Sequence, residues 1–224
     1  MATGGSIKSR YRGRLTAFVA LVALSVFVVF SGGDVLRAIV DGKWTELVDI
    51  KHLLSLGLPV ATLILDGIVT SDFKAALVYW KWRNPLPGHA AFTVHGRADS
   101  RVDMNALEAE HGPLPTDPVE QNRLWYKLSK ATANRGSVDE AHYAWLLARD
   151  LTSLSFALLI VTAGLAAVLR VGGWEWNALI TAQGLLYVVL SQVAANKGIR
   201  FVTTVLAEAG LQRNRNRRRS THPR

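Results

Sequence analysis

The chain of 224 residues contains no cysteine, and this absence alone removes several classes of site. Without thiols the protein can form no disulfide, no thiolate metal site and no cysteine nucleophile. The sequence also lacks a glycine-rich phosphate loop and a Ser/His/Asp order typical of nucleophilic enzymes. We therefore expect no catalytic residue and no cofactor.

Histidine does not replace the missing thiols as a metal ligand. His89, His95, His111 and His142 lie 6, 16 and 31 residues apart, and these spacings match no metal-ligand motif. We expect no metal site. Arg135 and His142 do have the Arg-x6-His spacing of HEPN-type ribonucleases, so a membrane-tethered nuclease remains one hypothesis. It requires an RNA cleavage activity that His142→Ala abolishes.

Acidic residues are scarce at both ends of the chain. The first 14 residues hold four Lys or Arg and no acid, and residues 197–224 hold eight against the single acid Glu208. Residues 72–150 are balanced, with ten bases and ten acids. A base gains on the order of 1 kcal/mol beside an anionic lipid surface, so we expect the tail at 213–219 to lie on a membrane.

Four long apolar runs dominate the rest of the sequence, at 15–31, 53–70, 151–169 and 177–195. As a helix, each run is long enough to cross, or nearly cross, a hydrocarbon core of ~30 Å. We therefore predict an all-α membrane protein with four transmembrane helices in a lipid bilayer. Basic flanks mark the cytoplasmic side, which places both termini in the cytoplasm at a bacterial inner membrane.

The predicted organisation has five parts. They are a basic N-terminus at 1–14, a hairpin of two spans with an interfacial exit helix at 15–83, a small and mainly helical cytoplasmic insertion at 84–150, a second hairpin at 151–195, and an amphipathic helix with a disordered basic tail at 196–224. The insertion therefore lies between the second and third spans.

Capping patterns locate helices inside the insertion. Ser100 and Asp103 have capping-box spacing before a helix at about 102–111, and Gly112 suits its C-terminal cap. Asp117 as N-cap and Pro118 at the first helical position start a helix that runs to about 133. A further helix starts at Ser137 and is expected to continue into the third span. Residues 91–96 are expected to be irregular or extended.

A polar stripe marks the second predicted span. Ser55, Pro59, Thr62, Asp66 and Thr70 lie 4, 3, 4 and 4 residues apart, so they share one face of a helix. An ionisable side chain in a span is costly and usually faces protein or water. The stripe either lines a pore or packs against other helices. Gln183 and Gln192 in the fourth span fit interhelical hydrogen bonding better than pore lining.

A basic face is predicted on the helix at 117–133. Arg123, Lys127 and Lys130 lie 4 and 3 residues apart beside two aromatic residues, Trp125 and Tyr126. Such a face suits the phosphates and bases of a nucleotide or single-stranded oligonucleotide. A solvated face, or one drawn to anionic lipid, is the alternative reading. The complete candidate set also includes Arg97, Arg101 and Arg135.

Three stretches of the insertion carry a resemblance to a known family. They are Leu86-Pro87-Gly88, Glu120-Gln121-Asn122 followed by Leu124-Trp125-Tyr126, and His142 to Asp150. With the four-span layout, they resemble the small four-helix membrane effectors of bacterial anti-phage defence, which include the Hailong type and others that accompany nucleotidyltransferases. The resemblance implies a homo-oligomeric, often tetrameric, membrane-disrupting channel that a nucleotide signal opens from the cytosol.

Two main hypotheses therefore stand beside the nuclease. The first is an oligomeric inner-membrane channel that a nucleotide or oligonucleotide gates through the insertion, with a nucleotidyltransferase as partner. The second is a membrane anchor without a pore, which recruits a soluble partner through residues 84–140.

Overall fold

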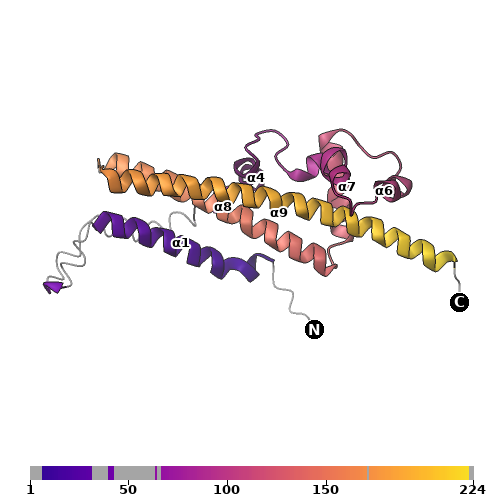
Figure 1. The fold of residues 1–224 in the computed structure, drawn as a ribbon, viewed down its shortest axis with the longest axis horizontal. Coiled ribbons are helices and arrows are strands. Elements are labelled where there is room, and N and C mark those ends of the chain that lie inside the picture. Colours follow the sequence, from indigo (N-terminus) through magenta and orange to yellow (C-terminus); the bar gives the residue numbers. More distant parts are fainter. Residues whose placement is uncertain (1–6, 32–39, 43–63, 65–66, 171, 222–224) are drawn as a thin grey trace. The chain divides into compact units, whose positions relative to one another are not determined.

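The computed structural model describes residues 7–31, 40–42, 64, 67–170 and 172–221, and all regular secondary structure in these ranges is helical. Within these ranges, three helices are long and apolar enough to cross a membrane, namely α1 (Ile7–Ser31), α8 (Gly136–Val168) and α9 (Trp174–Thr221) (Figure 1). The predicted all-α membrane protein is thus confirmed in its coarse form. The second predicted span, 53–70, lies almost entirely outside the described residues.

The chain divides into two compact units. The first unit comprises residues 1–70 and 149–191, and the second comprises 71–148 and 192–224. Both α8 and α9 contribute to each unit, because the division falls inside these helices. The prediction that the helix starting near Ser137 continues into an apolar span is confirmed, since α8 is unbroken from Gly136 to Val168.

The first unit packs α1 against the apolar stretches of α8 and α9. Its buried core consists of Val22, Ala23 and Val26 of α1 with Leu158 of α8. The α1 positions recur at helical spacing, so they form one face. Large apolar side chains elsewhere on these helices are exposed, among them Leu21, Leu24, Ile160, Leu185 and Val189. An outward apolar surface of this kind is typical of helices that face lipid.

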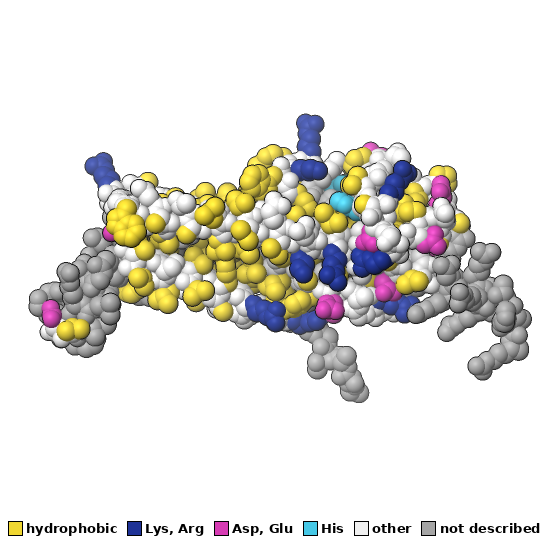
Figure 2. All heavy atoms as spheres, viewed as in Figure 1, with side chains coloured by type: hydrophobic (Ala, Val, Ile, Leu, Met, Phe, Trp, Pro, Cys, Tyr) yellow, Lys and Arg dark blue, Asp and Glu magenta, His cyan; other side chains and the backbone are white. Residues whose placement is uncertain are grey.

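The second unit gathers short helices around the end of α9. They are α4 (Ser71–Tyr79), the short helices η2 (Pro87–Ala90), η3 (Ala91–His95) and α5 (Gly96–Ala98), then α6 (Met104–His111) and α7 (Pro118–Ala131), with the start of α8. Its core includes Phe92, Leu107 and Leu128, which pack in one cluster with apolar residues of α9. On the face shown in Figure 2, charged side chains gather over this unit, whereas hydrophobic side chains cover the first half of α9.

The course of α9 corrects the prediction for residues 196–224. We expected a separate amphipathic helix on the membrane surface and a disordered tail, but α9 is one helix from Trp174 to Thr221. Phe201, Val202, Val205 and Leu206 are buried in the core of the second unit. This apolar stripe packs against protein, so the helix has no reason to end after the span.

Residues 91–95 form a π-helical turn and not the expected extended segment. The cause lies 28 residues away, in the buried side chain of Gln121. Its Oε1 accepts hydrogen bonds from Phe92 N at 3.0 Å, Thr93 N at 3.1 Å and Thr93 Oγ1 at 3.1 Å. Its Nε2 donates to Thr116 O at 2.9 Å. The side-chain amide of Gln121 thus accepts hydrogen bonds from backbone N–H groups of this turn that would otherwise lack an acceptor.

Local capping signals were more reliable. Asp117 caps α7 as predicted, and its carboxylate accepts from Val119 N and Glu120 N. Gly112 ends α6 at a φ of 76°, in the left-handed region that glycine tolerates. The N-cap of α6 is Asp103, which accepts from Ala106 N, and not Ser100.

Gly198 allows α4 to approach α9 closely. Tyr79 Oη donates to Ala195 O at 3.4 Å, and the Tyr79 and Trp145 rings lie 5.9 Å apart. Burial raises the pKa of Tyr79 far above its ordinary value, so its hydroxyl remains a donor. A Cβ at Gly198 would collide with the Tyr79 hydroxyl and lie 3.0 Å from the Trp145 ring.

We therefore predict that Gly198→Ala lowers the stability of the protein by about 1–3 kcal/mol, the usual cost of overpacking a core. Tryptophan-fluorescence thermal unfolding in detergent measures it. Gly210→Ala on the same helix is the matched control, because its Cβ would meet nothing closer than 3.6 Å. It should hold or slightly raise the midpoint, and a Gly198→Ala midpoint equal to that of Gly210→Ala contradicts the prediction.

Candidate functional site

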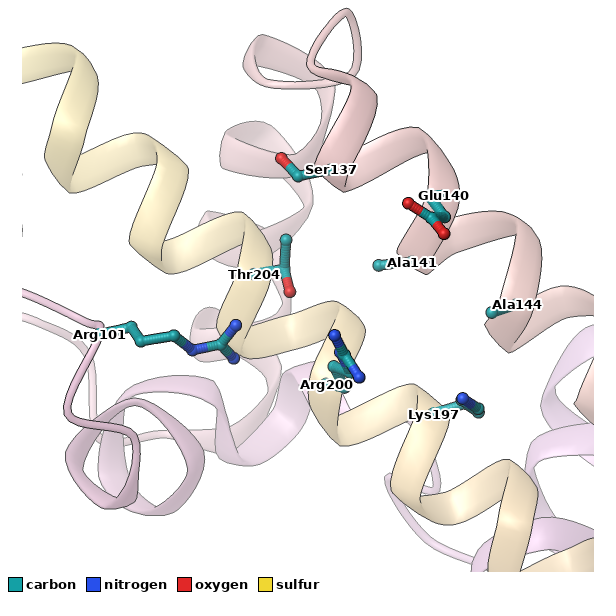
Figure 3. Close-up of a pocket in the computed structure, with 8 residues that line it drawn as sticks. All are labelled: Arg101, Ser137, Glu140, Ala141, Ala144, Lys197, Arg200 and Thr204. Carbon is teal, nitrogen blue, oxygen red and sulfur yellow. The ribbon is translucent and has the colours of Figure 1, made fainter.

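A groove in the second unit lies between the start of α8 and the later part of α9. Its cavity volume is about 220 Å³. The groove is lined by Arg101, Ser137, Glu140, Ala141, Ala144, Lys197, Arg200 and Thr204 (Figure 3). The α8 residues recur at intervals of three and four, as do those of α9, so each helix presents one face to the groove. Arg101 enters from the loop before α6.

Arg101 is held in the groove by an ion pair. Its Nε and Nη2 donate to Asp99 Oδ1 at 3.0 Å and Asp99 Oδ2 at 2.6 Å, and Nη2 also donates to Thr203 Oγ1 at 3.1 Å. The hydrogen bonds from Arg101 hold the pKa of Asp99 well below its ordinary value, and the same pairing raises the pKa of Arg101. The pair therefore stays charged, and Asp99 compensates the Arg101 charge.

Lys197 and Arg200 supply the excess positive charge of the groove. Within the described part of the chain, no carboxylate lies within ion-pair distance of either side chain. Glu140 is the one acid among the eight lining residues. Ser137 and Thr204 add hydroxyl groups, although Ser137 Oγ donates to Glu208 Oε1 at 2.6 Å. Two cations that form no ion pair among the described residues, together with nearby hydroxyls, favour an anion such as a phosphate group.

A second pocket adjoins the groove and shares Arg101 and Arg200 with it. Its cavity volume is about 380 Å³, and its other lining residues include His95, Asn196 and Thr203. Burial, followed by the charge of Lys81, lowers the pKa of His95 from its ordinary value of 6.5. The His95 ring is therefore neutral at pH 7 and can both donate and accept a hydrogen bond. Arg200 therefore lines both pockets.

The predicted basic face of α7 is a separate surface. Arg123 Nη1 pairs with Glu120 Oε1 at 2.7 Å, and Lys130 Nζ lies 5.3 Å from the Tyr126 ring centroid. Lys127 is exposed as well. None of these α7 residues lines the groove or the adjoining pocket. The structure therefore brings Arg123, Tyr126, Lys127 and Lys130 together, but apart from Arg101.

The remaining predicted ligand residues occupy three different places. Arg97 lines another pocket of about 270 Å³ with Glu108. Trp125 packs edge-on against Phe201 with ring centroids 5.3 Å apart, so its ring belongs to the core. Arg135 is half-buried at the turn before α8, and its Nε has no hydrogen-bond partner among the described residues.

Sequence reasoning did not assign Lys197 and Arg200 to a ligand site. It placed them on a membrane-surface helix, because their partners on α8 and in the loop before α6 lie more than 50 residues earlier in the chain. The available signal was the spacing of Lys197, Arg200 and Thr204, which puts two cations and a hydroxyl on one helical face.

The predicted membrane stripe is described at one position only. Ser55, Thr62 and Asp66 lie outside the described residues, and Thr70 is exposed just before α4. The two glutamines separate: Gln192 is exposed in the second unit, and Gln183 is buried in the first.

A buried polar cluster in the first unit escaped the sequence reasoning. Tyr11 Oη of α1 donates to Asp150 Oδ2 at 2.9 Å, and Arg149 Nε and Nη2 donate to Asp150 Oδ1 at 3.1 and 2.9 Å. Tyr11 and Asp150 are fully buried, and Arg149 nearly so. A buried charge is tolerated only when it is paired and hydrogen-bonded, and this cluster meets that condition while tying α1 to α8.

The residues considered for metal or nuclease chemistry have other surroundings. His142 stacks on Phe201 with ring centroids 4.7 Å apart and an interplanar angle of 5°. In the ranges that the structure covers, no group of three or more His, Asp or Glu side chains could hold a metal ion.

Comparisons with protein-family models, with curated proteins and with solved structures find no match to this chain.

We predict that the groove, and not the α7 face, binds phosphate-bearing anions. Lys197→Gln with Arg200→Gln should weaken pyrophosphate binding by about tenfold or more per cation, because a hydrogen bond to a charged group contributes about 1.5–3 kcal/mol. Isothermal titration calorimetry at two salt concentrations measures it. Arg123→Gln with Lys127→Gln removes the same charge from α7, and a larger loss in that control pair would move the site there.

We also predict that Tyr11→Phe weakens the association of α1 with α8. The substitution removes one hydroxyl and leaves Asp150 Oδ2 without that donor in a buried site, which should cost about 1–3 kcal/mol. Thermal unfolding in detergent reads this loss as a lower midpoint. The exposed Tyr126 provides the control substitution Tyr126→Phe, and equal midpoints for the two variants would show that the hydrogen bond to Asp150 is unimportant.

Proposed function

We propose that this protein is an oligomeric membrane channel that a phosphate-bearing ligand controls through the groove of the second unit. The proposed ligand is a nucleotide or a single-stranded oligonucleotide. Its phosphates would bind in the groove, and its other polar groups would bind in the adjoining pocket. The proposal makes the protein an effector that changes ion permeability, and it assigns the chain no catalytic step.

The continuity of α8 is the observation that carries this proposal. One helix bears Glu140, which lines the groove, and Asp150, which belongs to the buried cluster of the apolar helices. Ten residues of α-helix separate them, or about 15 Å along the axis. No loop intervenes to absorb a movement. Ligand binding that shifts the start of α8 is therefore transmitted to the cluster at Asp150.

The second long helix supports the same coupling. Lys197 and Arg200 belong to α9, as does Gln183, which is buried in the first unit. A ligand that binds both Lys197 and Arg200 changes the position or tilt of a helix that continues into an apolar span. A change of helix packing between two states is a recurrent way to convert binding into opening.

The setting of the channel is part of the proposal. The basic flanks favour a bacterial inner membrane with both termini in the cytoplasm. Soluble nucleotides in the cytoplasm would then reach the groove. A homo-oligomer, of which a tetramer is the favoured form, would surround a central path. The resemblance to anti-phage effectors adds membrane depolarisation in defence and a nucleotidyltransferase partner that makes the ligand.

Ion flux from liposomes tests the channel directly. The full-length protein is reconstituted into vesicles with a potassium gradient, and efflux is followed before and after pyrophosphate or ATP is added. We expect either probe to change the efflux rate several-fold. Lys197→Gln with Arg200→Gln should lose this response, whereas Arg123→Gln with Lys127→Gln should keep it.

An anchor without a pore is the competing function, and the α7 surface favours it. Arg123, Tyr126, Lys127 and Lys130 are exposed on one helix and could hold an acidic soluble partner. Efflux that never exceeds that of protein-free vesicles, with or without either probe, would reject the channel in favour of this alternative.

A further inference from the structure

A further cavity of the second unit lies at the end of α4, and its volume is about 480 Å³. We call it the α4 pocket. It shares no lining residue with the groove, and only His95 and Ile199 with the pocket that adjoins the groove. The polar residues of its wall that carry the inference are Lys81, Arg83, His89, Thr93, His95 and Thr116.

Lys81 and Arg83 bring positive charge to the α4 pocket, and no Asp or Glu is among its lining residues. Neither side chain forms an ion pair within the part of the chain that the structure describes. Burial, and then the charge of Lys81, lowers the pKa of His95, which indicates that Lys81 lies near this ring. Two such cations favour a ligand with negative charge.

The histidines of the α4 pocket add neutral hydrogen-bonding groups. His89 Nδ1 donates to Leu86 O at 3.0 Å, so Nε2 of the neutral ring is an acceptor. The neutral His95 ring has one donor and one acceptor, and Thr116 contributes a hydroxyl group. The wall therefore suits a ligand that combines negative charge with hydroxyl groups.

Part of this wall is rigid before any ligand binds. The buried Gln121, which also lines the α4 pocket, accepts hydrogen bonds from Phe92 N and Thr93 N and so holds the turn of η3 against α7. Thr93 and His95 both belong to that turn. Preorganised groups of this kind lower the cost of ordering a binding site.

The segment that carries the two cations has an unusual backbone. Trp80 and Asn84 lie on either side of it with φ of 55° and 49°, and a bulky residue such as tryptophan rarely adopts this left-handed conformation. Lys81 and Arg83 line the α4 pocket, whereas Trp82 between them lines a different cavity of about 490 Å³. The turn thus places both cations on one cavity and leaves the intervening ring outside it.

Exposed aromatic rings surround this segment. Trp80 is 61% exposed and Trp82 is 76% exposed, and the Trp82 ring lies 5.9 Å from the exposed ring of Phe73. The predicted span at 53–70 ends directly before α4, whose nine residues cover about 14 Å. Exposed tryptophans close to a span, with bases beside them, are typical of the headgroup level of a bilayer.

We propose that the α4 pocket binds the phosphodiester headgroup of an anionic glycerophospholipid. Lys81 and Arg83 pair with the phosphate oxygens, and the histidines bond to headgroup hydroxyls, such as those of phosphatidylglycerol. The rings of Trp80 and Trp82 lie at the membrane interface beside the bound lipid. A zwitterionic headgroup fits less well, because its ammonium group finds no carboxylate among the lining residues.

The lipid site goes beyond the proposed function and does not depend on it. An ion channel and an anchor without a pore could each hold such a lipid. The ligand-controlled efflux depends on Lys197 and Arg200, whereas lipid binding depends on Lys81 and Arg83. Failure of either experiment therefore leaves the other proposal standing.

Native mass spectrometry of the full-length protein in an uncharged detergent tests the site, because it resolves each bound lipid by mass. Phosphatidylglycerol, phosphatidylcholine with the same acyl chains, and glycerol 3-phosphate are titrated separately. We expect phosphatidylglycerol to bind tightest. Lys81→Gln with Arg83→Gln should weaken its first binding event about tenfold or more, because hydrogen bonds to a charged group are lost.

Two matched pairs control for charge and for the groove. Arg123→Gln with Lys127→Gln removes the same charge from α7, and Lys197→Gln with Arg200→Gln removes it from the groove. Both pairs should keep phosphatidylglycerol binding within about twofold of the parent protein. Lys81 and Arg83 are exposed, so their substitution should leave size-exclusion elution unchanged, and either single substitution serves if the pair does not fold.

Three outcomes would overturn the proposal. An equal loss in either control pair would show that lipid is attracted by overall charge and not by the α4 pocket. Equal binding of phosphatidylcholine, unaffected by Lys81→Gln with Arg83→Gln, would show that the headgroup is not recognised. Glycerol 3-phosphate that binds as tightly as phosphatidylglycerol, and is lost in the same variant, would make this a site for soluble phosphate esters.

Discussion

The packing of Phe201 and its apolar neighbours into the second unit is the constraint on which the rest of the molecule depends. Because that stripe needs a protein core, α9 continues through Thr221 without a break and brings Lys197 and Arg200 along on its adjoining face. The same ring of Phe201 contacts Trp125 of α7 and His142 of α8. One aromatic side chain thus joins three of the helices in this unit, and two of them, α8 and α9, border the groove.

Polar groups in the molecule follow three regimes of solvation. Those of the groove retain contact with water, so their charges are available to a ligand. Asp150 is dry, and it is tolerated because Tyr11 and Arg149 donate to it. Gln183 lies between these cases, since it is shielded from bulk solvent and its side-chain amide has no hydrogen-bond partner among the described residues. Because burial of a polar group costs free energy, each of these groups requires a partner that offsets the loss of water.

The structural features that were predicted best are those that depend on residues close in sequence. Asp117, Pro118 and Gly112 mark helix ends through contacts within a few residues, and the long apolar pattern of α8 needs no distant partner. Residues 91–95 could not be predicted, because their conformation depends on the Gln121 side chain nearly 30 residues later. For the same reason Arg101 was recognised as a candidate while Lys197 and Arg200, which complete its groove, were assigned to a membrane surface.

Arg149 and Asp150 are adjacent in sequence, and their side chains pair with each other inside the bundle. The positive and the negative charge therefore lie on the same turn of α8, and the pair carries no net charge. If α8 rotated or slid past α1, this ion pair could remain intact, and of the hydrogen bonds to Asp150 described above only the one from Tyr11 would have to break. Breaking that hydrogen bond removes a neutral donor from the carboxylate and leaves the ion pair intact, whereas the separation of two buried charges would cost far more in a medium of low dielectric constant.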